Sequence, residues 1–354
     1  MGQGRAGMPL FARLTRALTA LCVIGAVAVG TAQPSRAQEV RMVGSGASFP
    51  FPLYSAWFKD FSKKASGVTI DYQAKGSGAG IQDFINKTVD FAASDAAMKD
   101  DEIAKVESGV VLLPMTGGEI VLAYNLPGSP KGLKLPRDVY PDIFGGAITK
   151  WNDPRIQAAN PDIKLPDMPI TVVRRSDSSG TTFVFTKHLS AISPSFKEKI
   201  GSGTTVQWPT SDKFVAAPKN DGVTATIKQT PGAIGYIEYG YAKLTKAETA
   251  LLQNKSGNFI AGGDETGVAA LAAAKLGPDL RGWVEDPDGA EAYPIVTFTW
   301  MLFYKDQDDK KAAVLRDFVK YAATEGQKIS TSMGYIPLPE NVVEKVLAAS
   351  QQIQ

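Results

Sequence analysis

Short apolar stretches alternate with amphipathic segments along most of the chain. Residues 68–73, 89–93 and 120–125 are short, mainly apolar runs, which predict buried strands. Residues 81–88 lie between two of these runs and predict a helix. This alternation of strands and helices predicts an open α/β sheet.

The spacing of large apolar residues predicts helices at both ends of this pattern. Four aromatic residues recur at positions i, i+3, i+4 and i+7: Tyr54, Trp57, Phe58 and Phe61. This spacing places them on one buried face of a helix that begins near Pro50. Towards the other end, residues 312–326 and 342–353 predict two further helices.

Proline and glycine interrupt the middle of the chain and predict loops at residues 126–130, 160–162 and 165–169. Residues 296–304 (VTFTWMLFY) follow this region and predict a long apolar strand. The strands near residues 120 and 296 are candidates for crossings between two lobes, in which case the first lobe is discontinuous in sequence.

The first 37 residues have the layout of a secretory signal peptide. Basic residues precede an apolar run at positions 17–32, and the small-x-small pattern of residues 35–37 provides a cleavage site before Gln38. A membrane-spanning anchor is the alternative, but it needs about 20 apolar residues. Cys22 lies inside the run rather than after a small residue at its end, which argues against a lipoprotein anchor. We therefore expect export to the periplasm by a cleaved signal peptide.

Composition and charge exclude several classes of protein. With 44% hydrophobic and 21% charged residues in 354, the chain is neither disordered nor a multi-span membrane protein, and its length predicts about two domains. The net charge is +2, but residues 1–37 contain four arginines and no acidic residue, so the remainder has 34 basic against 36 acidic residues, or −2. This balance excludes nucleic-acid binding through a general basic field.

Three segments place small residues and a serine just ahead of a predicted helix. They are residues 44–50 (GSGASFP), 76–80 (GSGAG) and 176–182 (SDSSGTT). The first backbone N–H groups of a helix have no partner within it and carry partial positive charge, so such starts bind anions. Each segment taken alone is also explained by ordinary helix capping.

The third segment follows a predicted strand that ends in two arginines, residues 172–175 (VVRR). A guanidinium group offers paired donors that match an oxyanion. Arg175 and Asp177 are close enough in sequence for an ion pair that orients the guanidinium, although a pair on the surface is the simpler alternative.

Enzymatic alternatives find little support. Residues 76–80 with Asp95 faintly resemble a dinucleotide fingerprint, but the third glycine is misplaced. His188 is the single histidine and hence the only histidine base for a Ser-His-Asp hydrolase, and we expect it to be a surface or half-buried side chain. With one cysteine and one histidine we expect no metal, no cofactor and no catalytic residues.

Four segments together resemble the periplasmic phosphate-binding proteins of the phosphate-specific ABC transport system: residues 44–54, 89–96, 172–186 and 231–239. The resemblance covers nearly the whole chain after residue 37. It implies a type II periplasmic binding protein fold of the α/β class, with two lobes, a hinge and a central cleft. Residues 38–118 and 296–354 would form lobe I, and residues 119–295 would form lobe II.

The resemblance also implies which residues bind phosphate. They are Ser48, Phe49, Ser77, Asp95, Arg175, Asp177, Ser179, Gly180 and Thr181, with Asp177 holding Arg175 in place. This chain has Gly78 where some relatives have a second serine, and Ser48 where others have threonine. The implied partners are inorganic phosphate and an inner-membrane ABC permease with its ATPase subunits, for a monomer that binds no nucleic acid.

The role implied for Asp95 agrees with elementary chemistry. An ionised carboxylate only accepts hydrogen bonds, so it suits an anion that still carries a proton. Hydrogen phosphate does and sulfate at neutral pH does not, so Asp95 is expected to reject sulfate. The alternatives that remain are a receptor for another oxyanion, sulfate or molybdate, and a secreted phosphoester hydrolase.

Overall fold

The structure is a computed structural model that describes residues 39–272 and 274–354. The signal peptide expected at residues 1–37 lies outside the described residues. Among the helices that are described, none is long and apolar enough to cross a membrane.

One mixed sheet of eight strands and one of three account for the strands within residues 39–354 that are described. The large sheet has, in spatial order, β2 (Val68–Ala74), β1 (Val40–Gly46), β3 (Phe91–Ser94), β11 (Val296–Tyr304), β4 (Val110–Asn125), β8 (Ala233–Glu238), β6 (Thr171–Arg175) and β7 (Phe214–Ala217). The small sheet has β10 (Phe259–Ile260), β9 (Leu251–Gln253) and β5 (Lys134–Leu135). The α/β class expected from the alternating pattern is confirmed.

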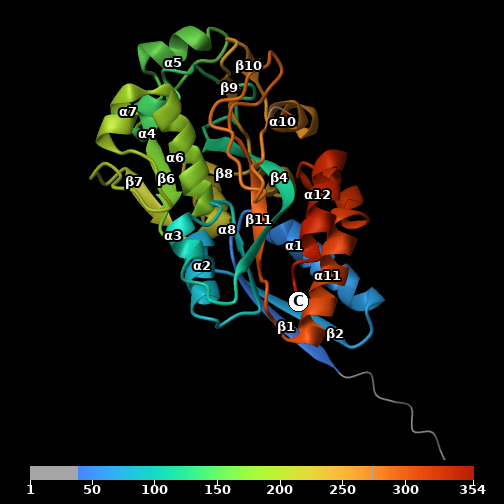
Figure 1. Cartoon of the computed structure of the whole chain (residues 1–354). Coiled ribbons are helices and arrows are strands. Elements are labelled where there is room, and N and C mark those ends of the chain that lie inside the picture. The colour runs from blue at the N-terminus through green and yellow to red at the C-terminus, as the bar shows by residue number, and fades with distance from the viewer. Residues whose placement is uncertain (1–38, 273) are drawn as a thin grey trace, which may run out of the picture. The chain divides into compact units, whose positions relative to one another are not determined.

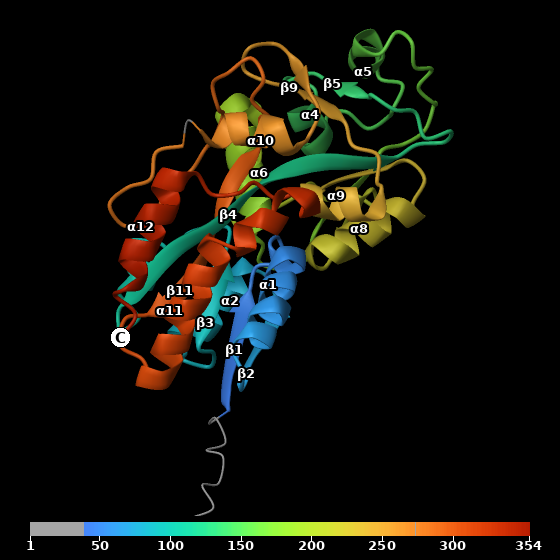
Figure 2. The ribbon, with the colours of Figure 1, turned by 90° about the vertical axis from the view of Figure 1, so that its right-hand side faces the viewer.

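Strand β4 joins two halves of the large sheet. Its residues 110–119 pair with β11, and its residues 120–125 pair with β8, so the partner changes between Glu119 and Ile120. We call β2, β1, β3, β11 and residues 110–119 the first half, and residues 120–125, β8, β6 and β7 the second half. Figure 2 shows β4 as one long strand, and its 16 residues belong to both halves.

The sequence predicted only the second part of β4. The predicted strand covered residues 120–125, whereas the observed strand begins at Val110. Pro114 and two glycines at 117–118 are poor strand formers and hide its first part. The structure tolerates Pro114 because the register with β11 shifts between Thr299 and Trp300, which leaves Met115 as the extra residue of a bulge.

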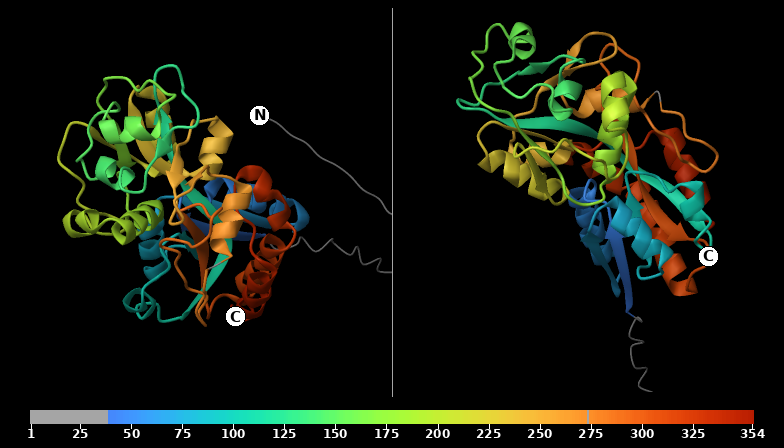
Figure 3. Two further views of the ribbon diagram at one scale, coloured as in Figure 1. Left: turned by 90° about the horizontal axis from the view of Figure 1, so that it is seen from above. Right: turned by 90° about the vertical axis from the view of Figure 1, so that its left-hand side faces the viewer.

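Helices cover the sheet and include all those predicted (Figure 1). Their bounds are α1 (Phe51–Lys64), α2 (Ser77–Ile85), α3 (Asp100–Ile103), α4 (Tyr140–Phe144), α5 (Pro154–Ala159), α6 (Gly180–Ile192), α7 (Pro194–Lys199), α8 (Lys219–Gln229), α9 (Tyr239–Thr245), α10 (Asp264–Leu271), α11 (Asp309–Ala323) and α12 (Glu340–Ser350), with short 3₁₀ turns at Gly326–Ile329 and Thr331–Met333. Helices α11 and α12, at the red end of the chain, lie side by side (Figure 3). Helix α2 starts four residues earlier than predicted, at Ser77.

The predicted face of α1 forms the centre of an aromatic core. The ring of Phe58 lies 5.9 Å from that of Tyr72 in β2, 5.7 Å from that of Phe91 in β3 and 5.1 Å from that of Phe318 in α11. Trp57 on the same face donates a hydrogen bond from Nε1 to the carbonyl oxygen of Gly326, at 2.8 Å. This helix therefore ties the N-terminal strands to the C-terminal helices.

Replacing Phe58 by alanine is expected to lower the free energy of unfolding by roughly 3–5 kcal/mol, because it leaves a cavity among these rings. Urea unfolding monitored by circular dichroism measures the change. Lys59→Ala is the matched control, since Lys59 is the next residue of α1 and is exposed. A loss no larger than that of the control would contradict the central position of Phe58.

Candidate functional site

The two halves of the large sheet direct the carboxyl ends of their parallel strands towards each other. Strands β1, β2 and β3 run parallel in the first half. Strand β6 is parallel to β8. Three antiparallel pairings connect β8 to β3 through β4 and β11, so β6 runs opposite to β3. The loops after β1, β2 and β3 therefore face the loop after β6, and these four loops carry the predicted anion-binding residues.

The start of α6 touches the first half of the sheet at Gly180. A Cβ atom at this position would lie 2.4 Å from Ser77 Oγ and 2.6 Å from Asp95 Oδ2, so only glycine fits. Ser179 precedes it as the N-cap residue of α6, and its Oγ accepts a hydrogen bond from the backbone N–H of Thr182 at 3.0 Å. The second and third predicted segments are thus brought into contact across the sheet.

Asp95 is a buried carboxylate with a fixed orientation. It follows β3 and is 1% exposed. Its Oδ1 accepts a hydrogen bond from Thr299 Oγ1 at 2.7 Å, and its Oδ2 lies 3.4 Å from Ser77 Oγ. Burial raises the pKa of Asp95 to about 7, although the Thr299 hydroxyl, the positive charge of Arg175 and the Ser77 hydroxyl all favour the ionised form. The carboxylate is therefore poised to share a proton near neutral pH.

Arg175 and Asp177 form an ion pair inside the protein. The Arg175 side chain is 1% exposed and gives two parallel hydrogen bonds to Asp177, one of them from Nε to Oδ1 at 2.8 Å. Its Nη1 donates to Thr181 Oγ1 at 3.2 Å. Burial opposes ionisation of Asp177, but the guanidinium outweighs it and lowers the pKa of that carboxyl. The surface pair considered as an alternative is therefore wrong.

Several backbone N–H groups at the helix starts have no acceptor within the described residues. These belong to Ser48 and Phe49 ahead of α1 and to Gly180 and Thr181 at the start of α6. Phe49 contributes only through its backbone, since its side chain is fully buried and its carbonyl oxygen already accepts a hydrogen bond from Tyr335 at 2.8 Å. These four groups are donors of the kind that an oxyanion requires.

Asn220 joins this cluster and was not predicted. It lies in the first turn of α8, is fully buried and donates hydrogen bonds to Ser48 Oγ and Thr181 Oγ1. The sequence carried a weak signal, since a proline precedes it by two residues at the start of a helix. Thr299 was missed as well, because it lies within a strand that is mostly apolar. All nine predicted residues lie in this connected cluster or next to it in sequence.

Gly78, the position that differs from some relatives, packs against Ser178. Its backbone N–H donates to the Ser178 carbonyl oxygen at 3.1 Å, and a Cβ atom at this position would lie 2.0 Å from Ser178 Oγ. A serine at position 78 would clash with Ser178 as it is placed in this chain. The glycine thus permits the close contact between the two loops.

His188 is buried within α6, which corrects the expectation of a surface or half-buried side chain. Its Nδ1 lies 2.7 Å from the carbonyl oxygen of Glu285 and its Nε2 lies 2.8 Å from the Tyr140 hydroxyl. A carbonyl oxygen only accepts, so Nδ1 carries the proton and Nε2 accepts from Tyr140. Burial lowers the pKa of His188 to about 4. With both nitrogens occupied, it is not placed to act as a base.

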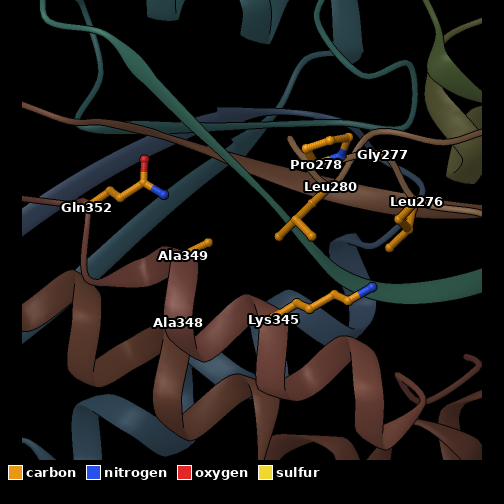
Figure 4. Close-up of a pocket in the computed structure, with 8 residues that line it drawn as sticks. All are labelled: Leu276, Gly277, Pro278, Leu280, Lys345, Ala348, Ala349 and Gln352. Atoms are coloured by element: carbon orange, nitrogen blue, oxygen red, sulfur yellow. The ribbon is translucent and has the colours of Figure 1, made fainter.

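The pocket shown in Figure 4 is lined by none of the residues of this cluster. It has a volume of about 520 Å³ and is lined by Leu276, Gly277, Pro278, Leu280, Lys345, Ala348, Ala349 and Gln352. A crevice of about 290 Å³ is closer, since Gly78, Ala96 and Ala97 in its lining adjoin Ser77 and Asp95 in sequence. No group of three or more potential metal-ligating side chains occurs in the part of the chain that the structure describes.

Comparison with known proteins identifies relatives over most of the chain. Residues 29–325 match the profile of the PBP superfamily domain. The chain is 38% identical over 360 residues to the phosphate-binding protein PstS of Methanocaldococcus jannaschii, with 94% of this chain and 92% of the relative covered. It is also 38% identical over 315 residues to the phosphate-binding protein PstS of Haemophilus influenzae, with 88% and 92% covered.

Solved structures resemble the fold. The high-affinity periplasmic phosphate-binding protein PfluDING with bound phosphate aligns with a TM-score of 0.73 and 23% identity, over 87% of this chain and 93% of the other. A putative phosphate ABC transporter substrate-binding protein from Clostridium perfringens with bound phosphate aligns with a TM-score of 0.62 and 17% identity, over 85% and 100%. At these identities the likeness establishes the fold, and the periplasmic binding protein architecture expected from the sequence is confirmed.

The buried position of Asp95 predicts a pH dependence of stability. The pKa of Asp95 in the folded protein, about 7, lies above the ordinary value of 3.8. Its contribution to the free energy of unfolding is therefore fully present below pH 3.8 and is lost as the pH rises through 7. Asp95→Asn has no ionisable group at this position and does not show this loss. The variant is expected to gain stability relative to the wild type by roughly 1.4 kcal/mol per pH unit between pH 5 and 7, and the difference then levels off.

Urea unfolding in phosphate-free buffer at several pH values measures this difference. Asp212→Asn is the control, since the Asp212 side chain is 84% exposed. A difference between Asp95→Asn and the wild type that does not change with pH would contradict the raised pKa.

Proposed function

The chain belongs to the PBP superfamily and, within it, to the PstS phosphate-binding proteins, and on this premise we propose that it binds inorganic phosphate in the periplasm and delivers it to the permease of an ABC transporter. The observation that carries the proposal is the meeting of a buried carboxylate, Asp95, with the N-terminus of α6 and the buried Arg175. These groups offer one acceptor among many donors. Hydrogen phosphate has the complementary pattern, with one proton and several acceptor oxygens.

The donors stabilise an anion without a large net charge. The charge of Arg175 is balanced by Asp177, so attraction comes mainly from N–H and O–H dipoles at the helix starts. Asp177 fixes the plane of the guanidinium and leaves Nη hydrogens to donate to the ligand. Ser48, Ser77 and Thr181 add hydroxyl groups, and Ser179 keeps the first turn of α6 in place.

Asp95 supplies the selectivity for a protonated anion. Its ionised form accepts the phosphate proton, whereas sulfate at neutral pH would place two acceptors in contact in a buried site. The relatives named PstS favour phosphate over the sulfate and molybdate alternatives. They are binding proteins, and together with the occupied nitrogens of His188 they support a receptor without catalytic activity over a phosphoester hydrolase.

Two lobes, residues 38–118 with 296–354 and residues 119–295, are proposed to close on phosphate. Strand β4 changes its partner from β11 to β8 between residues 119 and 120, which supports a hinge at this point. The second connection between the lobes, at residues 295–296, lies next to it, since the N–H of Ile120 donates to the carbonyl oxygen of Ile295 at 2.9 Å. One segment of lobe II reaches over lobe I, where Arg281 Nη2 contacts Asp100 Oδ1 at 2.6 Å. The monomeric closed form would dock on the permease with its ATPase subunits, after the leader of residues 1–37 has directed export.

Asp95→Asn is expected to lower the preference for phosphate over sulfate by roughly 10- to 100-fold, because an amide N–H can donate to a sulfate oxygen. Isothermal titration calorimetry with both anions at pH 8 measures the ratio. Asp212→Asn again serves as the control. An unchanged ratio would remove Asp95 from the selectivity role, and a wild-type protein that binds no phosphate would overturn the proposed function.

Gly180→Val is expected to prevent closure, because a side chain at this position overlaps Ser77 and Asp95. Small-angle scattering should show that phosphate reduces the radius of gyration of the wild type and leaves that of the variant unchanged. Ala191→Val, at an exposed position near the other end of α6, should behave as the wild type does. Compaction of Gly180→Val equal to that of the wild type would contradict closure at this contact.

A further inference from the structure

Asn220 forms hydrogen bonds to two predicted phosphate-binding residues, Ser48 and Thr181, although it was not itself predicted to bind phosphate. It is fully buried in the first turn of α8, directly after Lys219, which has a backbone φ of +58°. Its backbone N–H and its Nδ2 both donate to Ser48 Oγ, at 3.2 and 3.1 Å. Its Nδ2 also donates to Thr181 Oγ1 at 3.1 Å, and its Oδ1 accepts from the backbone N–H of Glu238 at 3.0 Å. Every polar atom of the side chain has a partner.

These bonds fix the direction in which two hydroxyl groups donate. A hydroxyl has two acceptor lone pairs and one donor hydrogen. Ser48 Oγ receives two N–H groups from Asn220. Thr181 Oγ1 receives one from Asn220 and one from Arg175, at 3.1 and 3.2 Å. Both oxygens therefore have their lone pairs engaged, and each hydroxyl hydrogen is left to donate to a further acceptor.

The amide orientation follows from the same contacts. The Glu238 N–H can only donate, so the Asn220 atom facing it is the oxygen, and the atom facing the two hydroxyl groups is the nitrogen. Glu238 ends β8, in the second half of the sheet, and is fully buried. The side chain is therefore held by a backbone group of the sheet and presents donors alone to Ser48 and Thr181.

We propose that Asn220 is a positioning residue that holds the Ser48 and Thr181 hydroxyls as obligate donors to phosphate oxygens, which makes it a determinant of affinity and of selectivity for the ligand's protonation state. The inference rests on the proposed function. With both hydroxyls restricted to donating, Asp95 is the one side chain among Ser48, Asp95, Arg175 and Thr181 that can accept a ligand proton. A monohydrogen anion satisfies these four side chains, and an anion with a second proton does not.

Asn220 also links the two proposed lobes. Ser48 belongs to lobe I, whereas Asn220 and Thr181 belong to lobe II, so the bonds between Asn220 and Ser48 require the contact seen here between the lobes. The orientation of the Ser48 hydroxyl is therefore completed only when the lobes are together. The Ser48 hydroxyl is then oriented as a donor at the same time as the lobes close.

Asn220→Ala is expected to lower the affinity for inorganic phosphate by roughly 10- to 100-fold at pH 8, because two hydroxyls lose their fixed orientation. Asn220→Asp keeps the shape and the acceptor for Glu238 but replaces the two side-chain donors by an acceptor. Ser48 and Thr181 then donate to the new carboxylate, and the loss of affinity should exceed that of Asn220→Ala. Isothermal titration calorimetry measures both, and thermal melts of the ligand-free proteins establish that they fold.

A double-mutant cycle separates this role from a merely structural one. In a Ser48→Ala background the effect of Asn220→Ala on phosphate affinity should shrink at least threefold, since one of the two hydroxyls that Asn220 orients is gone and only the Thr181 hydroxyl remains. Additive effects would overturn the proposal. Thr226→Val is the control within α8, where Thr226 Oγ1 donates to the carbonyl oxygen of Gly222 at 2.8 Å, and it should leave affinity unchanged.

The pH profile gives a second readout. Loss of the fixed donors should reduce the preference for the monohydrogen over the dihydrogen anion, so the affinity of Asn220→Ala relative to that of the wild type should recover as the pH falls from 8 to 6. A ratio that is constant with pH would overturn the selectivity role. If the wild type binds no phosphate, the proposed function fails; if it binds and Asn220→Asp binds equally well, this inference alone fails.

Discussion

The contact between Gly180 and the buried pair of Ser77 and Asp95 is the constraint on which the site depends. It brings the N-terminus of a 13-residue helix against a carboxylate at a distance that admits no side chain. An ionised carboxylate with little solvent is unfavourable unless donors surround it. Here the Thr299 hydroxyl and the charge of Arg175 supply part of that stabilisation, yet burial still dominates and raises the pKa of Asp95 to about 7.

The electrostatic balance explains how an anion receptor can have almost no net charge. The charged side chains among the predicted binding residues are one guanidinium, Arg175, and two carboxylates, Asp95 and Asp177, so these residues together are not cationic. Attraction for an anion must come from oriented N–H and O–H groups, whose dipoles act strongly where water is excluded. This agrees with a chain that has net charge −2 after residue 37, and it makes the orientation of each hydroxyl more important than the number of lysines and arginines.

The architecture of the sheet supplies that orientation from distant parts of the chain. Strand β4 passes from the first half to the second, so the loops after β3 and β6 face each other. Strand β11 lies between β3 and β4 and places Thr299 beside Asp95, from which it is 204 positions distant in sequence. Helix α8 places Asn220 beside Ser48, 172 positions away. Predicted binding residues therefore form hydrogen bonds to polar side chains that are distant from them in sequence.

The sequence by itself determined the α/β class, the buried face of α1 and the types of residue in the site, because periodicity and helix-start composition report local burial and local capping. It also indicated that an ion pair between Arg175 and Asp177 was possible, since they are two positions apart. Only the tertiary structure decided that this pair lies inside the protein, that burial raises the pKa of Asp95 to about 7, that His188 lies in the core, and that Asn220 and Thr299 form hydrogen bonds to predicted binding residues. Burial and long-range hydrogen bonds depend on segments that meet only in the folded sheet, so no local pattern records them.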